Sequence, residues 1–196
     1  MFSSKTIIPK FYDEFGNLYA ESVVEDVYKQ VYFQVTNGST IKRTFRPYTR
    51  EMCDGFIDFN NGYKGLQEVK LKKTGKPNPS PIAYNRQVAQ MLKYYYNLVK
   101  WFKYSKEELP VFIANSNTYF SWFTYREIKH CIGDFFSIVD HMPIGENRPT
   151  ACKLYDYEPV KQFIDTNNDC FNKHILILED DFDFEEVFKE IFSNPI

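Results

Sequence analysis

The sequence predicts an α/β domain with a mixed central β-sheet flanked by helices. Two segments, residues 17–35 and 83–103, carry apolar side chains at helical spacing. Residues 51–59 and 65–72 have the character of strands and flank an Asn-Gly pair that favours a hairpin turn. Two further strands, 110–114 and 118–125, follow the second helix around an Asn-Ser-Asn turn. This order of helix, hairpin, helix and strands is typical of a sheet covered by helices.

The first helix should bury a stripe formed by Leu18, Val23 or Val24, Val27 and Val31. Three prolines and a glycine in residues 73–82 predict a loop before the second helix. That helix has an apolar stripe and a polar stripe, so we expect one buried and one exposed face. The apolar stripe is Val88, Leu92, Tyr95, Val99 and Phe102, and the polar stripe is Arg86, Gln90, Lys93, Asn97 and Lys100.

The last part of the chain carries weaker patterns. A short helix is expected at 157–166, a strand at 173–178 and a helix at 183–193 after an acidic cap. We therefore divide the chain into a core, residues 1–125, and a C-terminal extension of the same domain, residues 126–196.

Composition excludes several classes of protein. The 196 residues are 43% hydrophobic and 18% aromatic, which argues against disorder. The sequence lacks an apolar run long enough for a membrane span and the apolar core of a secretory signal. The four cysteines form no CxxC pair, and His130, His141 and His174 lack metal-ligand spacing, so the sequence does not indicate zinc. A cytoplasmic protein with reduced thiols is expected.

Charge is unevenly distributed. Residues 179–190 hold seven acidic residues and one lysine, and so contribute −6 to the net charge of −2. The rest of the chain therefore carries +4, a mild bias that is compatible with local contact with phosphate groups. For the acidic segment, mimicry of DNA and a solvated face of a capped surface helix both remain open.

The register of the predicted hairpin decides whether Asp54 and Glu68 meet. A two-residue Asn61-Gly62 loop would place Asp54 opposite Val69, and the two carboxylates would lie on opposite faces. A three- or five-residue loop centred on Asn61 places Asp54 opposite Glu68 instead. This register also pairs Phe56 with Leu66 and Asp58 with Lys64, so apolar meets apolar and acid meets base. We prefer it for that reason.

In that register two acids lie side by side, and such a pair is destabilising unless a cation lies between them. Carboxylate oxygens with water suit Mg²⁺ or Mn²⁺. Lys70, two residues after Glu68 on the same face, adds a positive charge for a phosphate or an attacking water. Two acids, a lysine and a hard cation can hydrolyse a phosphodiester bond.

These residues resemble the PD-(D/E)xK superfamily of nucleases, which includes restriction endonucleases. The matching residues are Asp54 in CDGFIDF and Glu68-x-Lys70 in LQEVKLK, with Cys53 where the superfamily expects proline. Gln90 with Tyr94 fits a Q-x-x-x-Y pattern of an exonuclease-like branch. An acid from the preceding helix often completes such sites, and Glu25 is favoured over Glu21. The resemblance covers about residues 17–115.

The resemblance implies a restriction-endonuclease-like fold and a Mg²⁺-dependent site that cuts DNA. Asp54 and Glu68 would hold the metal with the Val69 carbonyl as a third ligand, Lys70 would orient the attacking water, and Gln90 would assist. Glu25 or Glu21 would join this metal site or a second one. For the basic residues after the site, contact with the DNA backbone and an ordinary solvated loop or exposed helix face both remain open, and these residues are Lys72, Lys73, Lys76, Arg86 and Lys93.

The resemblance also suggests a biological setting. This fold is often the cleavage module of restriction–modification enzymes, and PVFIANSNTYFSWF resembles a strand pair in single-chain enzymes that also methylate DNA. The implied partners are DNA, a methyltransferase or specificity module, and a second copy of the chain for double-strand cleavage. The aromatic residues of this segment would either form the core around the strands or stack against bases. The competing interpretation is an inactive module that keeps the fold for DNA or protein binding.

Overall fold

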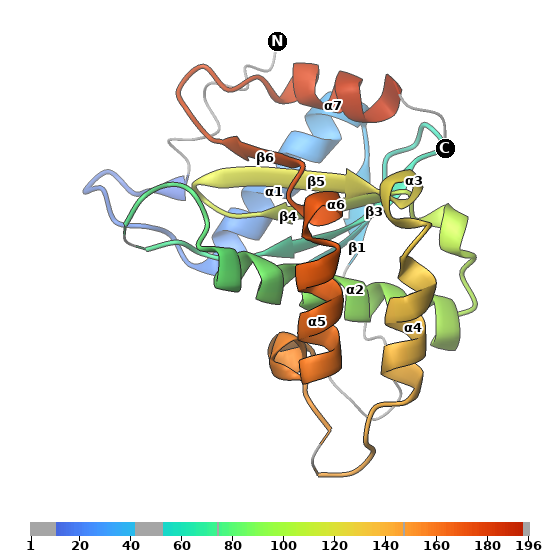
Figure 1. Ribbon diagram of the computed structural model, residues 1–196. Helices are drawn as coiled ribbons and strands as arrows, with labels where there is room; N and C mark the ends of the chain where they lie inside the picture. Colours follow the sequence, from blue (N-terminus) through green and yellow to red (C-terminus); the bar gives the residue numbers. More distant parts are fainter. Residues whose placement is uncertain (1–10, 42–52, 74, 147, 194–196) are drawn as a thin grey trace.

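A six-stranded mixed sheet forms the centre of the molecule in the computed structural model, which describes residues 11–41, 53–73, 75–146 and 148–193. The strands lie in the order β1-β2-β3-β4-β5-β6, so neighbours in the sheet are also neighbours in sequence (Figure 1). Strands β3 and β4 are parallel and every other pair is antiparallel. The predicted α/β class with a mixed sheet and flanking helices is therefore confirmed.

The elements follow the predicted order closely. The strands are β1 Ser39–Ile41, β2 Gly55–Asp58, β3 Lys64–Val69, β4 Val111–Asn115, β5 Tyr119–Thr124 and β6 His174–Ile177. The α-helices are α1 Glu21–Thr36, α2 Pro81–Trp101, α3 Tyr125–Ile128, α4 Ile132–Asp140, α5 Glu158–Thr166, α6 Asn168–Phe171 and α7 Phe184–Ser193. Two 3₁₀ turns, η3 Lys106–Glu108 and η4 Ala151–Asp156, complete the chain.

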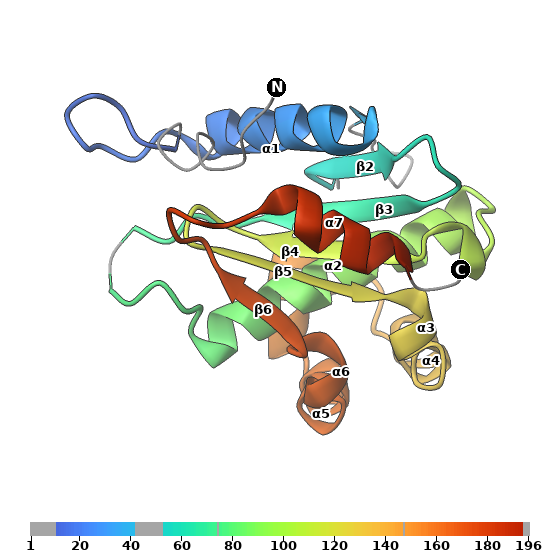
Figure 2. The same ribbon diagram turned by 90° about the horizontal axis from the view of Figure 1, so that it is seen from above.

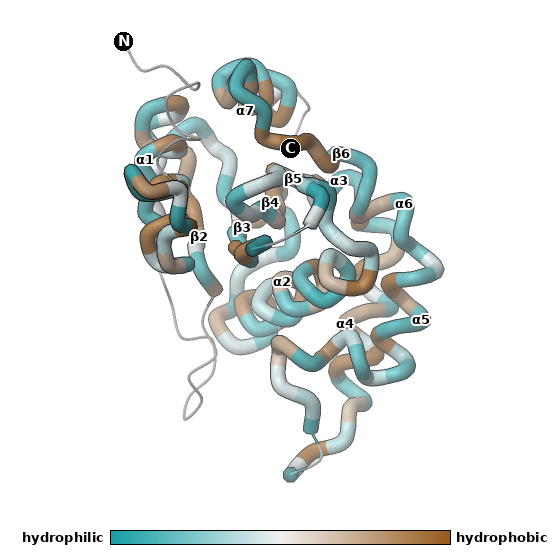
Figure 3. Tube along the Cα trace, turned by 90° about the vertical axis from the view of Figure 1, so that its left-hand side faces the viewer, coloured by the Kyte–Doolittle hydropathy of each residue, from teal (hydrophilic) through white to brown (hydrophobic). Residues whose placement is uncertain are grey.

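Helices cover both faces of the sheet. Helices α1 and α7 lie on one face, whereas α2, α4 and α5 lie on the other (Figures 2 and 3). Each face has its own apolar core. Val69 and Ile57 face the core beneath α1 and α7, and Phe56 and Leu66 face the core beneath α2. The sheet is thus buried on both sides, which explains why β3 is buried over five consecutive residues.

The hairpin between β2 and β3 has the register that the side chains favoured. Phe56 pairs with Leu66 and Asp58 with Lys64, leaving a five-residue loop centred on Asn61. The loop turns through Asn60 and Gly62, both at positive φ. Gly65 is needed for the approach of β4, since a Cβ there would lie 2.7 Å from the Val111 carbonyl oxygen. The preferred register is confirmed, and it fixes the positions of the candidate site residues.

The start of α2 follows from its sequence. The Ser80 hydroxyl accepts a hydrogen bond from the Ala83 amide at 3.3 Å, and Pro81 occupies the first turn. The prediction of an exposed polar stripe on this helix is wrong for Gln90, Lys93 and Asn97, which are all buried. The physical reason is that α2 has packing partners on more than one side, namely β3 and β4 of the sheet and η4 and α5 of the C-terminal extension.

The C-terminal extension contributes to both layers. Strand β6 pairs with β5, and helix α7 packs against α1 at the other end of the chain. The predicted helix at 157–166, strand at 173–178 and helix at 183–193 are confirmed within one to two residues at each end. Helices α3, α4 and α6 and strand β1 were not predicted. None of the helices in the described part of the chain is long and apolar enough to cross a bilayer.

Candidate active site

Asp54 lies at the entrance to β2, where the hairpin register carries it to Glu68. The ladder ends at the pair of Gly55 with Gln67, and continuing the same register by one residue places Asp54 opposite Glu68. The Asp54 carboxylate accepts a hydrogen bond from the backbone amide of Val69 at 2.7 Å. This bond fixes the Asp54 side chain against the end of β3, beside Glu68.

Helix α1 supplies two further acids to the same place. The carboxylates of Glu21, Glu25 and Asp54 each have an oxygen within 4.8 Å of the other two. Glu21 and Glu25 lie four residues apart, which places them on one face of a helix. Glu25 is buried, at 4% exposure, although it is charged in water. The structure thus places Asp54 close to both of the helix acids that the sequence analysis proposed for the site, Glu21 and Glu25.

Two carboxyl groups at this site, those of Asp54 and Glu68, have raised pKa values. Burial raises the pKa of Asp54 to about 7, the Val69 amide opposes the rise, and neighbouring Glu25 and Glu21 add to it. Burial also raises the pKa of Glu68 well above its ordinary value, and the charge of Asp54 acts in the same direction. Lys70 opposes that effect. Perturbed acids that share one site are typical of functional centres.

Lys70 and Glu68 form an ion pair at the edge of the cluster. The Lys70 ammonium lies 3.3 Å from Oε1 of Glu68, and its side chain is 39% exposed. Oε2 of Glu68 is buried and has no hydrogen-bond partner among the described residues. A buried carboxylate oxygen without a partner is costly in a folded protein. Oxygen donors of this kind fit Mg²⁺ or Mn²⁺, so the residues present suit the expected metal.

Helix α2 supports the site from the other face of the sheet. The Gln90 side-chain amide donates to the Tyr94 hydroxyl at 2.9 Å, so the two residues of the Q-x-x-x-Y pattern are bonded to each other. Gln87 was not singled out from the sequence. Its amide donates to the carbonyls of Glu68 at 2.7 Å and Asn115 at 2.9 Å, and so ties β3 to β4. The only sequence feature that could have indicated Gln87 is its position about one helical turn before Gln90.

The contacts that the structure describes for Val69 involve its side chain and its backbone amide. Its side chain is buried in the core under α1, and its amide holds Asp54. The Val69 carbonyl as a metal ligand stays a prediction. Gln67, also on β3, accepts a hydrogen bond from the Tyr32 hydroxyl of α1 and one from the Asn115 amide at 3.1 Å. These bonds join α1, β3 and β4 directly behind the acids.

Four of the five expected DNA-contacting residues lie where a ligand has access. A cavity of about 350 Å³ is lined by Lys70, Lys72, Arg86 and Gln90, among others. Lys72 is fixed through its backbone, since its amide donates to the Asn117 side chain at 2.8 Å. Lys73 and Lys76 are exposed on the same loop, and Arg86 forms an exposed ion pair with Asp156 at 3.2 Å.

Lys93 is the exception, and its assignment to DNA binding is wrong. Its side chain is only 1% exposed, because the stripe to which it belongs faces inwards. Its ammonium donates to the Asn97 side chain at 2.8 Å and lies 5.5 Å from the centre of the Tyr96 ring. Lys93 therefore has a structural role within α2.

Comparison of the chain with protein-family models, with curated proteins and with solved structures returns no match. The functional argument therefore depends on the geometry of the site itself.

Proposed function

We propose that this protein is a Mg²⁺-dependent nuclease that hydrolyses DNA phosphodiester bonds. The observation that carries the proposal is that the acids Glu21, Glu25 and Asp54, which have carboxylate oxygens within 4.8 Å of one another, lie beside a second pair, the buried Glu68 and the partly exposed Lys70. These acids come from α1 and from the two strands of the hairpin, in the order that the PD-(D/E)xK resemblance implies. The Gln90–Tyr94 pair on the following helix adds support. We infer a restriction-endonuclease-like core on the same grounds.

Asp54 and Glu68 would hold the metal, with Glu25 or Glu21 at its side. A divalent cation bound there supplies an acidified water and positive charge for the scissile phosphate. The chain itself orients the reactants. The Val69 amide holds the Asp54 carboxylate at the end of β3, and Glu68 holds the Lys70 ammonium at 3.3 Å. The partly exposed Lys70 then faces the phosphate, where it positions the attacking water and balances developing negative charge.

DNA would approach along the loop between β3 and α2. Lys72, Lys73 and Lys76 line this approach, and Arg86 stands beside Lys70 in the same cavity. Lysine and arginine side chains position a nucleic acid through its phosphates without reading its sequence. A restriction-type cleavage of DNA is preferred over cleavage of RNA because the resembling family mostly cuts DNA.

A cleavage assay with matched variants tests the proposal. Supercoiled and linear DNA are incubated with Mg²⁺ or Mn²⁺ and either the wild-type protein or the Lys70→Met variant. Removal of a group that stabilises transition-state charge lowers the rate by about 100-fold or more. The matched control is Lys100→Met, because Lys100 lies at the far end of α2 in an exposed ion pair with Asp140. Equal loss in both variants, or none in Lys70→Met, would contradict the proposal.

Metal binding distinguishes the proposed nuclease from the competing interpretation, an inactive module with the same fold. Calorimetry with Mn²⁺ compares the wild type with Asp54→Ala and with Asp58→Ala. Asp58 lies on the same strand but pairs with Lys64 at the turn, so its loss should leave the heat of binding unchanged. Equal heats for wild type and Asp54→Ala would exclude this metal site.

A further inference from the structure

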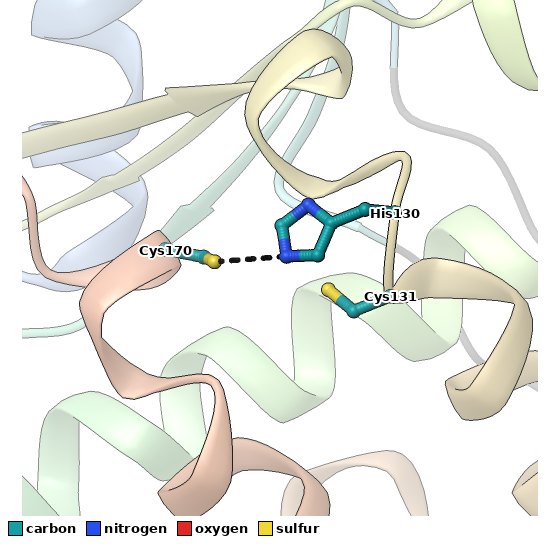
Figure 4. A group of neighbouring side chains, drawn as sticks. All are labelled: His130, Cys131 and Cys170. Carbon is teal, nitrogen blue, oxygen red and sulfur yellow. Dashed lines mark hydrogen bonds between the residues drawn. The ribbon is translucent and has the colours of Figure 1, made fainter.

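A second cluster of metal-ligating side chains lies in the C-terminal extension. His130 and Cys131 occupy the turn between α3 and α4, and Cys170 belongs to α6. Nε2 of His130 lies 3.7 Å from Sγ of Cys170, and all three ligand atoms lie within 4.8 Å of one another. Figure 4 shows the two thiols and the imidazole directed towards one another.

Neither local spacing nor the order of these residues indicated this cluster. The two segments are 40 residues apart in sequence and meet only because α6 returns to the end of α3 before β6. Adjacent residues such as His130 and Cys131 often point apart, but here the chain turns sharply between two helices. The Cys131 amide donates to the Ile128 carbonyl at 3.0 Å, closing that turn. Both side chains are then presented to Cys170.

The spacing matches what a tetrahedral ion requires. Zinc binds thiolate at about 2.3 Å and imidazole at about 2.0–2.1 Å, so the sulfur and nitrogen ligands of one ion lie about 3.6 Å apart. The observed separation of 3.7 Å between His130 and Cys170 agrees with that value. Two thiolates and one imidazole are soft and borderline donors, which favour Zn²⁺ over Mg²⁺ or Ca²⁺.

We propose that His130, Cys131 and Cys170 bind one Zn²⁺ ion that joins the α3–α4 turn to α6. Water occupies the fourth position. Access is provided by a cavity of about 490 Å³ that Cys170 lines together with Glu127 and Asp169, and by His130, which is exposed. Glu127 is held by other partners, since it accepts from the Thr124 amide at 3.1 Å and pairs with Lys173 at 3.5 Å.

Reactive-cysteine chemistry fits the cluster less well than metal binding. A nucleophilic or redox-sensing cysteine needs an accessible thiolate with a lowered pKa. Burial instead raises the pKa of the Cys131 thiol to about 12, with the neighbouring Cys170 adding to the rise. Cys131 is also only 4% exposed. A bound metal would instead use all three side chains, whose ligand atoms lie within 4.8 Å of one another.

Cobalt substitution tests the proposal with the full chain, reduced and freed of metal. Co²⁺ bound by two thiolates gives a sulfur-to-metal charge-transfer band and intense visible bands, which carboxylate-bound Co²⁺ does not give. We expect one equivalent of thiolate-bound Co²⁺ per chain, displaced by Zn²⁺. The Mg²⁺ site at Asp54 lacks sulfur, so the result is independent of the proposed nuclease activity.

Variants assign the ligands. Cys131→Ser, Cys170→Ser and His130→Asn should each lower the Zn²⁺ affinity by about 100-fold or more, since changes even outside the ligand set cost about 10–100-fold. His130 is exposed, so its replacement leaves the fold intact even where Cys131→Ser does not. The matched control is Cys152→Ser, another exposed residue in the extension.

Three results would overturn the proposal. The first is the absence of the charge-transfer band in the wild type, and the second is its persistence in Cys170→Ser. The third is a Cys131–Cys170 disulfide in the protein as isolated, identified by mass spectrometry after alkylation, with no Co²⁺ binding after reduction. Retention of the band in Cys152→Ser together with its loss in His130→Asn supports the site.

Discussion

Replacing Asp54 with asparagine removes one negative charge from the buried acid cluster with little change in shape. The asparagine carbonyl can still accept the Val69 amide, which donates to Asp54 at 2.7 Å. In metal-free buffer this charge destabilises the fold, chiefly because the Asp54 side chain is buried and also because Glu25 and Glu21 lie close to it. We therefore expect Asp54→Asn to be more stable than the wild type at alkaline pH when no metal is present.

The magnitude follows from the pKa of Asp54, which rises from 3.8 to about 7 in the folded protein. A tenfold change in proton affinity is worth about 1.4 kcal/mol, so the full rise corresponds to about 4 kcal/mol. Since the folded pKa lies above the unfolded value, the folded state binds more protons between these two pH values. The free energy of unfolding therefore falls as pH rises, by about 3 kcal/mol between pH 5 and pH 8.

Urea unfolding in the presence of a chelator measures this difference, with the fluorescence of buried Trp122 as one signal. The difference in unfolding free energy between Asp54→Asn and wild type should grow by about 3 kcal/mol from pH 5 to pH 8. Saturating Mn²⁺ should then stabilise the wild type and not the variant. A difference that stays constant with pH would refute the idea that the charge of Asp54 destabilises the metal-free protein.

Three further predictions concern the residues around the acids. Gln87→Leu leaves the Glu68 and Asn115 carbonyls without their shared donor, and should lower the unfolding free energy by about 1–3 kcal/mol in urea titrations, whereas an unchanged midpoint would argue against the bridge. Lys73→Ala with Lys76→Ala should weaken DNA binding equally for unrelated sequences and reduce the slope of log affinity against log salt by about 2, as binding titrations at several salt concentrations would reveal. A sequence-dependent loss would instead indicate base contacts. Gln90→Ala should reduce cleavage in single-turnover assays while Mn²⁺ binding persists, and loss of both together would make Gln90 a structural residue.

The sequence was sufficient for the hairpin because its constraints are local. Side-chain parity allowed two registers, and the pairing of Phe56 with Leu66 and Asp58 with Lys64 selected one of them. That choice determined which face Glu68 occupies. Helix periodicity likewise placed α1 and α2, although α2 begins at Pro81 and ends at Trp101, two residues before the predicted start and end.

The features that sequence patterns missed depend on contacts between distant segments. The polar stripe of α2 looked like a solvent-facing surface, but Gln90, Lys93 and Asn97 on this stripe are buried. Periodicity reports which residues share a face and cannot report what packs on that face. The cluster of His130, Cys131 and Cys170 was missed for the same reason, because it forms only when α6 reaches the end of α3.

The packing of α7 on α1 has a consequence for the order in which the candidate site forms. Tyr28 and Tyr32 of α1, the helix that carries Glu25, contact the rings of Phe184 and Phe188 of α7. During synthesis these aromatic partners leave the ribosome more than a hundred residues after the helix that they hold. A nascent chain that already contains all the acids therefore lacks the packing that seats Glu25. We therefore predict that a truncation before residue 184 yields a chain that binds the divalent ion poorly while keeping every proposed ligand.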